Sequence, residues 1–320
     1  MRGADYVIKR TLFAVMTIFV AVTLNFVLFR ALPGDIISNL SKVPGATPQL
    51  RAEITQEFGL DRSKWEQYWV YLGQLTKGNL GVSYSSVEPV STELARAVGN
   101  TIPMVLLGTV FAIVFGTITG VLAAWKRRTV LDYGSVSTAL IFYSLPTHWL
   151  GLMLLLLTAG VLPRGGRQDD FLVDPTFMEH ILDVGKHMLL PSLTLGLVLY
   201  GQYTLVTRSA MLETLGEDFI LTARAKGLPD RTIVRRHAFR NAMLPVMTLV
   251  ALSLGYIVAG SILIETVFSW PGVGLLVSRS VERRDWPVLQ GAFLVLTISV
   301  VLCNYVVDLL YFKLDARITT

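Results

Sequence analysis

Charged residues are scarce in this chain of 320 residues. Only 16% of its residues are Asp, Glu, Lys or Arg and 52% are hydrophobic, whereas about a quarter of an ordinary soluble domain is charged. Cysteine is nearly absent as well: Cys303 is the only one, so no intrachain disulfide forms and the fold does not depend on oxidation. The composition therefore indicates a membrane protein.

Six long stretches contain no charged residue at all. Each reaches the roughly 18–20 residues that a helix needs to cross hydrocarbon. They are Thr11–Phe29, Ala97–Trp125, Tyr133–Pro163, Met188–Thr207, Asn241–Ile264 and Trp286–Val307. The first stretch is too long for the core of a cleaved signal peptide, and no small-x-small cleavage site follows it. We therefore predict an all-α, polytopic membrane protein with six transmembrane helices.

The basic residues are divided unevenly between the two sides of the membrane. If the N-terminus is inside, the cytoplasmic segments hold 15 Lys and Arg residues and the two short outer loops hold 6. Basic residues concentrate on the cytoplasmic side of membrane proteins, so both termini are predicted to be cytoplasmic. The net charge of +5 then reflects orientation, and nucleic acid is not an expected partner.

Three regions follow from this topology. Residues 1–30 form the N-terminal tail and the first transmembrane helix, and residues 31–96 form an extracytoplasmic helical segment. Residues 97–320 form a five-helix core that carries a cytoplasmic loop at 208–240. This loop is the only long cytoplasmic segment.

The extracytoplasmic segment has the start and stop signals of two helices. Thr47-Pro48 begins the first and Gly59 ends it; Asp61 caps the second, which ends near Gly78. One face of the second helix carries Trp65, Tyr68, Trp69, Leu72 and Leu75. Such a face suits the membrane–water boundary or packing on the outer ends of the spans.

Helix breakers and small residues interrupt the predicted spans. Trp270-Pro271-Gly272-Val273-Gly274 leaves too few residues for another crossing, so a short re-entrant or interfacial piece is expected there. Prolines that favour kinks and glycines that allow close helix approach are Pro103, Pro146, Pro191, Gly116 and Gly120.

The spans lack the groups that would power transport. A proton- or sodium-driven carrier places ionisable side chains in mid-membrane, and His148 is the only such group here. Because it follows Pro146, a hydrogen-bonded structural histidine is favoured over a proton or substrate role. A self-contained proton-coupled carrier is therefore disfavoured.

Nucleotide and metal chemistry are not indicated either. A phosphate-binding loop needs Gly-x4-Gly-Lys-Ser/Thr, and Gly196 and Gly201 share only its glycine spacing. His180, Asp183 and His187 could ligate a metal, but this pattern is more typical of an ordinary loop surface. We predict that this chain is not an enzyme and has no catalytic, cofactor-binding or metal-binding residue. The energy for transport is then expected to come from another chain.

The cytoplasmic loop reads as two short helices. The first runs from Glu217 to Lys226, Gly227 suits a left-handed cap and Pro229 prevents continuation. Asp230 then caps a second, basic helix that contains Arg231, Arg235, Arg236 and Arg240. Small Ala223 and Ala225 would let a partner approach, and Arg224 and Lys226 would donate charge-assisted hydrogen bonds. The alternative is a basic surface that binds lipid headgroups.

The string EDFILTARAKGLPDRTIVRRHAFRNAMLP, from Glu217 to Pro245, resembles the cytoplasmic segment of the dipeptide, oligopeptide and nickel permease family of ABC importers. The resemblance covers nearly the whole chain. It includes Pro33-Gly34-Asp35, Phe58-Gly59-Leu60-Asp61, Gly78-Asn79-Leu80-Gly81 with Pro89-Val90, Leu190-Pro191-Ser192-Leu193-Thr194, Phe268 to Gly274, Asp308-Leu309-Leu310-Tyr311 and Leu314-Asp315-x-Arg317.

The chain departs from the broader importer pattern of Glu-Ala-Ala, three residues, Gly, nine residues and Ile-x-Leu-Pro. With Gly227 as anchor, Leu221 stands at the glutamate position, and a Leu-Pro pair comes later, at Leu244-Pro245. This departure is typical of the peptide and nickel branch.

The resemblance implies a type I ABC importer in a bacterial or archaeal cytoplasmic membrane. Its expected partners are a second homologous permease, two ATP-binding subunits that hold ATP and magnesium, an extracytoplasmic solute-binding protein and the lipid bilayer. The residues expected to couple to the ATPases are Glu217, Asp218, Phe219, Thr222, Ala223, Arg224, Ala225, Lys226 and Gly227.

Peptides are the expected cargo, and nickel complexes or oligosaccharides are the alternatives within the same architecture. The residues of the substrate pathway cannot be assigned without geometry. A channel or an uncoupled membrane scaffold is the rival from another class, and it would not need the Ala-Arg-Ala-Lys-Gly segment.

Overall fold

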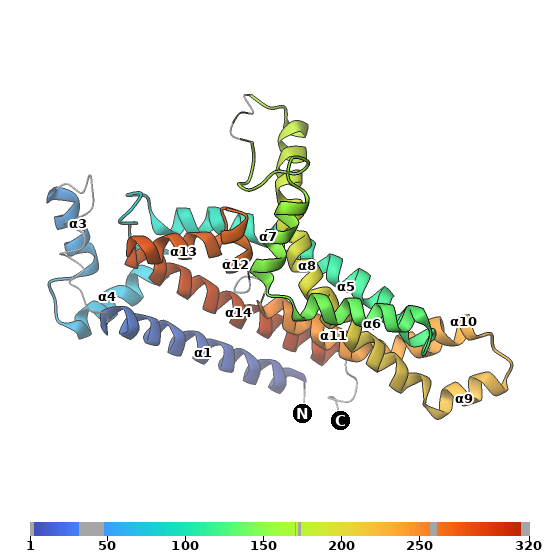
Figure 1. The fold of residues 1–320 in the computed structure, drawn as a ribbon. Coiled ribbons are helices and arrows are strands. Elements are labelled where there is room, and N and C mark those ends of the chain that lie inside the picture. Colours follow the sequence, from blue (N-terminus) through green and yellow to red (C-terminus); the bar gives the residue numbers. More distant parts are fainter. Residues whose placement is uncertain (1–2, 32–47, 170, 172–173, 257–260, 315–320) are drawn as a thin grey trace. The chain divides into compact units, whose positions relative to one another are not determined.

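The computed structural model describes residues 3–31, 48–169, 171, 174–256 and 261–314 (Figure 1). The chain divides into two compact units, one of residues 1–101 and 271–320 and one of residues 102–270. The helices are α1 (Gly3–Ala31), α3 (Pro48–Phe58), α4 (Lys64–Thr76), α5 (Val90–Trp125), α6 (Val130–Ser144), α7 (Thr147–Leu157), α8 (Phe177–Leu215), α9 (Asp218–Ala225), α10 (Asp230–Thr232), the π-helix η1 (Ile233–Ala238), α11 (Phe239–Tyr256), α12 (Ile262–Val267), α13 (Val273–Arg283) and α14 (Trp286–Leu314).

In the described residues, four helices are long and apolar enough to cross a membrane: α1, α5, α8 and α14. Helices α6 and α7 count as a fifth crossing if the bent pair is taken as one span. The break predicted at Pro146 within the span Tyr133–Pro163 is confirmed, because the chain bends by 106° between α6 and α7. Leu145, the residue before Pro146, is extended, with φ −72° and ψ 132°. The proline ring disfavours a helical conformation at the residue before it, so the helix stops there.

The fifth predicted span, Asn241–Ile264, corresponds to α11 and the beginning of α12. Helix α11 ends at Tyr256 and α12 begins at Ile262. Residues 257–260 between them lie outside the described residues, so a continuous crossing here stays a prediction.

In the unit of residues 1–101 and 271–320, α1 packs along α14. The Asn25 amide donates to the Gln290 carbonyl (3.0 Å), and near the other end of α1 Arg10 pairs with Asp308. An apolar cluster joins these two helices to α4 through Phe26, Tyr68 and Leu294. Polar bonds and apolar packing therefore hold the first and last spans together.

Helices α3 and α4 form where the sequence predicts them, but the cap of α4 differs. The first helix starts at Pro48, and Gly59 follows it with φ +58°. The N-cap of α4 is Ser63, not Asp61. Ser63 and Glu66 form a capping box, in which each side chain bonds to the backbone N–H of the other residue. The Ser63 hydroxyl donates to Glu66 (2.7 Å) and holds the pKa of that carboxyl below its ordinary value.

The residues predicted on one face of α4 divide between core and surface. Tyr68 is buried, and Leu72 and Leu75 pack on the same cluster. Trp65 and Trp69 are exposed. The face therefore both packs on the spans and presents indole rings outward.

Asp285 organises the outer loop of this unit. Its carboxylate accepts hydrogen bonds from the Ser83 hydroxyl (2.6 Å) and from the backbone N–H groups of Tyr84 (3.1 Å) and Ser85 (2.9 Å). Asp285 lies between α13 and α14, one residue after Arg284, the C-cap of α13. Helix α13 is amphipathic, Gly272 is its N-cap, and it begins within the piece predicted to be re-entrant or interfacial. The loop is thereby tied to the start of α14.

In the unit of residues 102–270, α5 and α8 are in close contact through glycines. A methyl group added at Gly116 would lie 2.6 Å from the Tyr203 Cβ, and one at Gly120 would lie 2.6 Å from the Thr204 carbonyl. Facing glycines let helix backbones approach closely. The close approach predicted for Gly116 and Gly120 is confirmed.

Enlarging this contact should destabilise the protein. We expect Gly116→Ala to lower the free energy of unfolding by about 1–3 kcal/mol, because the added methyl group overpacks a site with no space. Gly134→Ala in α6 is the control, since a methyl group there meets nothing within 4 Å. Thermal unfolding of the two variants in one detergent measures the difference; equal melting temperatures would contradict the tight contact.

Candidate coupling surface

The predicted coupling residues lie on a hairpin at the end of α8, where the chain turns through α9 and α10 (Figure 1). Helix α9 begins after Glu217, which is extended, with φ −76° and ψ 150°. Its first residue is Asp218, and a negative side chain is favourable at the positive end of a helix. The acidic start predicted for this helix is confirmed.

A Schellman motif ends α9. The Gly227 N–H donates to the Arg224 carbonyl (2.9 Å), and the Leu228 N–H donates to the Ala223 carbonyl (3.3 Å). Gly227 has φ +74°, the left-handed conformation that this motif requires and that glycine adopts without strain. Leu228 packs on the apolar cluster below the helix, so the turn is fixed on both sides.

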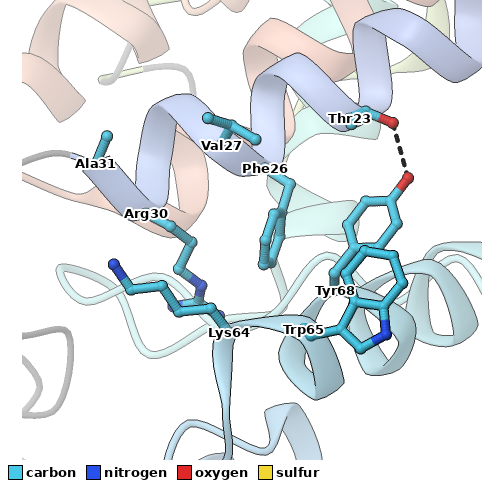
Figure 2. A pocket seen from close by; sticks show the side chains of 8 residues that line it. All are labelled: Thr23, Phe26, Val27, Arg30, Ala31, Lys64, Trp65 and Tyr68. Carbon is cyan, nitrogen blue, oxygen red and sulfur yellow. Dashed lines mark hydrogen bonds between the residues drawn. The ribbon is translucent and has the colours of Figure 1, made fainter.

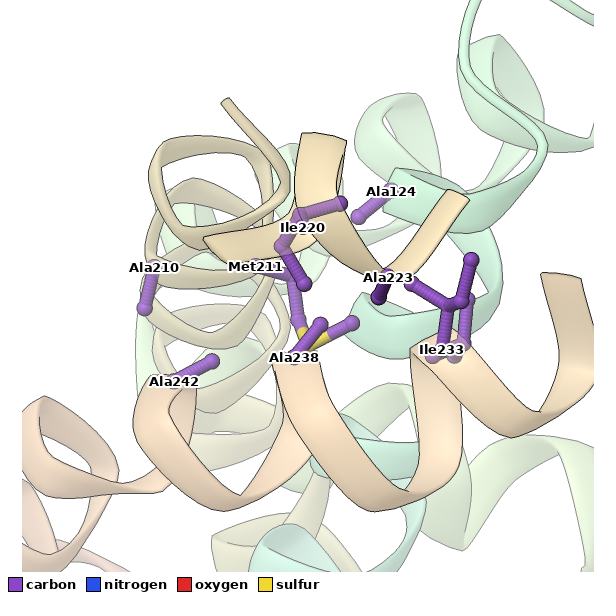
Figure 3. Close-up of a cluster of buried hydrophobic side chains, with 9 residues drawn as sticks. Ala124, Ala210, Met211, Ile220, Ala223, Ile233, Ala238 and Ala242 are labelled. Atoms are coloured by element: carbon purple, nitrogen blue, oxygen red, sulfur yellow. The ribbon is translucent and has the colours of Figure 1, made fainter. Parts of the chain in front are cut away.

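The inner face of α9 is part of an apolar core (Figure 3). Ile220 is fully buried and Ala223 is only 5% exposed. They pack in one cluster with Ala210 and Met211 of α8, Ala124 of α5, and Ile233, Val234, Ala238 and Ala242 beyond the turn. The prediction that Ala223 faces a partner is therefore wrong, because Ala223 lies against the protein's own core.

The opposite face of α9 is open. Arg224, Ala225 and Lys226 are exposed, as are Glu217, Asp218 and Thr222. Two large apolar side chains are exposed with them, Phe219 at 40% and Leu221 at 57%. We call this face, residues 217–219, 221, 222 and 224–226, the coupling surface.

The second arm of the hairpin differs from the prediction in two ways. Pro229, not Asp230, holds the cap position, and Asp230 is the first helical residue. The second helix is also not short, because η1 and α11 continue it without interruption. Ile233, Val234 and Ala238 are buried in the cluster, whereas Arg231, Arg235 and Arg236 are exposed.

A buried ion pair connects α8 to α6 near this hairpin. The Arg208 guanidinium donates to both oxygens of Asp132, at 2.7 and 3.0 Å, and the Arg128 N–H donates to the same carboxylate at 2.9 Å. Asp132 is 2% exposed. Such a bidentate, charge-assisted pair holds its partners in one geometry, so it sets the start of α6 relative to α8.

Two family models match the chain. The binding-protein-dependent transport system inner membrane component matches residues 116–320, and the N-terminal part of the same kind of membrane component matches residues 4–106. The chain belongs to this family. It is a component of a binding-protein-dependent transport system of the inner membrane, and a multi-pass membrane protein.

Relatives of known function match over nearly their full length. The dipeptide transport system permease protein DppB of Escherichia coli (strain K12) is 39% identical over 97% of this chain and 98% of its own. The di/tripeptide transport system permease protein DppB of Pseudomonas aeruginosa (strain UCBPP-PA14) is 37% identical, and the glutathione transport system permease protein GsiC of Escherichia coli (strain K12) is 36% identical; each alignment covers 98% of both chains.

A solved structure shares the fold. A chain of the inward-facing MetNI methionine ABC transporter aligns with a TM-score of 0.54 at 19% identity, over 69% of this chain and 96% of its own. The predicted fold class, an all-α membrane protein of the ABC importer type, is confirmed.

The histidines that the sequence singled out lie on α7 and α8. His148, expected to be a hydrogen-bonded structural residue, is exposed in the first turn of α7. His180, Asp183 and His187 lie along α8, where the His187 ring nitrogen is 2.9 Å from the Asp183 carbonyl. No group of three or more His, Cys, Asp or Glu residues that could hold a metal is found in the described part of the chain.

Leu221 is missing from the coupling residues that the sequence predicts. The sequence places it at the glutamate position of the broader pattern, which does not identify it as a surface residue. Its exposure follows only once the structure shows that Ile220 and Ala223 form the buried face of α9, because Leu221 then lies on the open side of the helix.

Removing one partner of the buried pair should cost far more than removing an exposed one. We expect Arg208→Met to lower the free energy of unfolding by about 3–5 kcal/mol, because it leaves the buried Asp132 carboxylate without its cation. Asp132→Asn should cost less, because the Arg208 side chain is 25% exposed and can reach water. The double variant should lose less than the sum of the two single variants.

The exposed pair Arg96–Glu88, 3.4 Å apart with side chains 65% and 47% exposed, is the matched control. Its variants Arg96→Met and Glu88→Gln should change the unfolding free energy by about 1 kcal/mol or less. Both double-mutant cycles are read by thermal unfolding in detergent. Additive effects at Asp132 and Arg208 would show that the two side chains are not coupled.

Proposed function

We propose that this chain is the membrane-spanning permease subunit of an ATP-driven, binding-protein-dependent importer of peptides. The family membership and the full-length similarity to dipeptide, di/tripeptide and glutathione permeases support it. The shared chemistry of those named cargoes is a short peptide. Nickel complexes and oligosaccharides are the alternative cargoes.

The chain works without an active site of its own. ATP and magnesium bind to two partner ATPases, a second homologous permease completes the translocation pathway, and an extracytoplasmic binding protein delivers the cargo. The membrane is the cytoplasmic membrane of a bacterium or archaeon. The chain's own task is to form half of the pathway and to transmit movement.

The observation that carries the mechanism is the division of α9 into a buried and an open face. Ile220 and Ala223 attach α9 to the ends of α5 and α8 and to the start of α11. The coupling surface carries Phe219 and Leu221 for an apolar socket and Arg224 and Lys226 for charge-assisted bonds with a partner. When the ATPases close, a rigid α9 moves with them and carries the attached spans.

The competing class is a channel or membrane scaffold whose basic hairpin binds lipid headgroups. Arg231, Arg235 and Arg236, which are exposed on the second arm, would suit the binding of lipid headgroups. Exposed Phe219 and Leu221 would suit either a lipid surface or an apolar socket of a partner. The membership in a family of binding-protein-dependent transport components supports docking of a protein.

Uptake tests the function and the turn together. In proteoliposomes with its partner permease, ATPases and binding protein, the wild-type chain should import a labelled dipeptide only when ATP is present. Gly227→Val should lower that uptake roughly 5- to 30-fold, because a β-branched residue costs about 1–2 kcal/mol in the left-handed conformation. A methyl group added there meets nothing within 4 Å, so only the backbone is strained.

Gly227→Asn is the control, because asparagine tolerates the left-handed conformation, and it should retain uptake close to wild type. Uptake unchanged in Gly227→Val would contradict the role of the turn. Wild-type uptake of a nickel complex or an oligosaccharide in place of dipeptides would overturn the proposed cargo, and uptake independent of ATP would overturn the importer.

A cross-link tests the partner of the coupling surface. With Cys303 replaced by serine, a photoactivatable cross-linker attached to Ala225→Cys should form a product with an ATPase subunit, because position 225 is exposed. Ala223→Cys, two residues away and only 5% exposed before substitution, should give little product. Products with lipid or another permease loop alone would support the basic-surface alternative.

A further inference from the structure

A pocket lies between the outer end of α1 and the start of α4 (Figure 2). Its volume is about 470 Å³, and its wall is mainly apolar, with Phe26, Val27, Trp65 and Tyr68 among the lining residues. Two basic residues, Arg30 and Lys64, also line it. None of the coupling residues takes part in it.

The aromatic wall is held in place from both helices. The Phe26 ring meets the Tyr68 ring edge-on at 5.2 Å, and the Trp65 ring stacks on Tyr68 at 6.0 Å between centroids. The hydroxyls of Thr23 and Tyr68 lie 2.7 Å apart, as the dashed line in Figure 2 shows. Phe26 and Tyr68 are buried in the core between α1, α4 and α14, so this wall is preformed.

The two cations lack an acidic partner in the described part of the chain. The Arg30 guanidinium lies over the Phe26 ring, 5.4 Å from its centroid, and no ion pair of Arg30 or Lys64 is found there. Glu66, in the first turn of α4, is held by the Ser63 hydroxyl and N–H. An anion with an apolar attachment would complement this arrangement.

The position of the pocket specifies what that anion is attached to. Arg30 stands at the end of the first span, and from there to Thr23 the pocket extends along α1 by about 10 Å. Because the N-terminus is cytoplasmic, the Arg30 end of α1 lies at the outer membrane–water boundary. Indole rings concentrate at this boundary, and Trp65 is exposed there. The outer leaflet offers phosphates that carry hydrocarbon chains at this depth.

We propose that this pocket binds an anionic phospholipid of the outer leaflet. Its phosphate accepts charge-assisted hydrogen bonds from Arg30 and Lys64, and one acyl chain lies against Phe26, Val27 and Trp65. The lipid thereby bridges the first span and the extracytoplasmic helix α4. The binding depends on membrane topology and not on the cargo, so it stands apart from the proposed function.

Lipid titration of the full-length chain, read by native mass spectrometry, tests this site. Phosphatidylglycerol should bind more tightly than phosphatidylcholine. Arg30→Gln and Lys64→Gln should each weaken phosphatidylglycerol binding about fivefold, the usual contribution of one basic residue near a membrane surface. Lys77→Gln, which removes an exposed cation just beyond the other end of α4, should change nothing.

Two further measurements distinguish a bound phospholipid from a free phosphate and from lipid that surrounds the protein without a site. Trp65→Ala should weaken phosphatidylglycerol binding, and soluble glycerol phosphate should not compete for the site at concentrations equal to the lipid. Competition by glycerol phosphate would overturn the lipid assignment in favour of a free phosphate site. Equal binding of the two lipids, or an equal loss in Lys77→Gln, would show an unspecific annular or charge effect and refute the site. Lys64 is exposed, so its variant remains informative if Arg30→Gln fails to insert.

Discussion

The glycine-lined contact between α5 and α8 is the constraint on which the unit of residues 102–270 depends. Where a methyl group would lie 2.6 Å from the opposite helix, no larger residue fits and no sliding is tolerated. Dense packing resists continuous deformation and transmits displacement. Because α8 runs without interruption from this contact to Leu215, the position set by Gly116 and Gly120 extends to the cytoplasmic hairpin.

The hairpin is built on the far end of that same helix. Met211, fully buried one turn beyond Arg208, packs in the cluster that receives Ile220 and Ala223. The bidentate pair of Arg208 with Asp132 attaches α6 to α8 at nearly the same level. A force on α9 therefore reaches α8 through apolar packing and α6 through an ion pair, with no flexible joint between them in the described residues.

Local signals predicted local structure well. Uncharged stretches located the long helices, and the positive φ of Gly59 and Gly227 agrees with the stops placed there. Errors arose where two local signals competed: Ser63 and Asp61 are both good caps, and only Ser63 has a glutamate three residues later. At Pro146 the sequence predicted a kink, but the size of the bend depends on what α7 packs against.

Contacts between distant segments could not be predicted at all. Whether Ala223 or Ala225 faces outward depends on which side of α9 meets α8, and no periodicity in an eight-residue helix determines that. The pair of Asp132 and Arg208 joins residues 76 positions apart, and the pocket at Arg30 needs α4 to fold back on α1. A single amino-acid sequence holds no record of such proximity.

Charged side chains are scarce in this protein, and the position of each one has an identifiable physical reason. In hydrocarbon an ion must be paired or reach water, and two described pairs follow that rule: Arg208 with Asp132 and Arg10 with Asp308. The basic residues of the cytoplasmic loops orient the chain. Arg30 and Lys64 belong to neither group, because they lie on the outer side and line an apolar pocket. No carboxylate in the described residues forms an ion pair with them, and an anionic lipid headgroup at that depth would complement their charge.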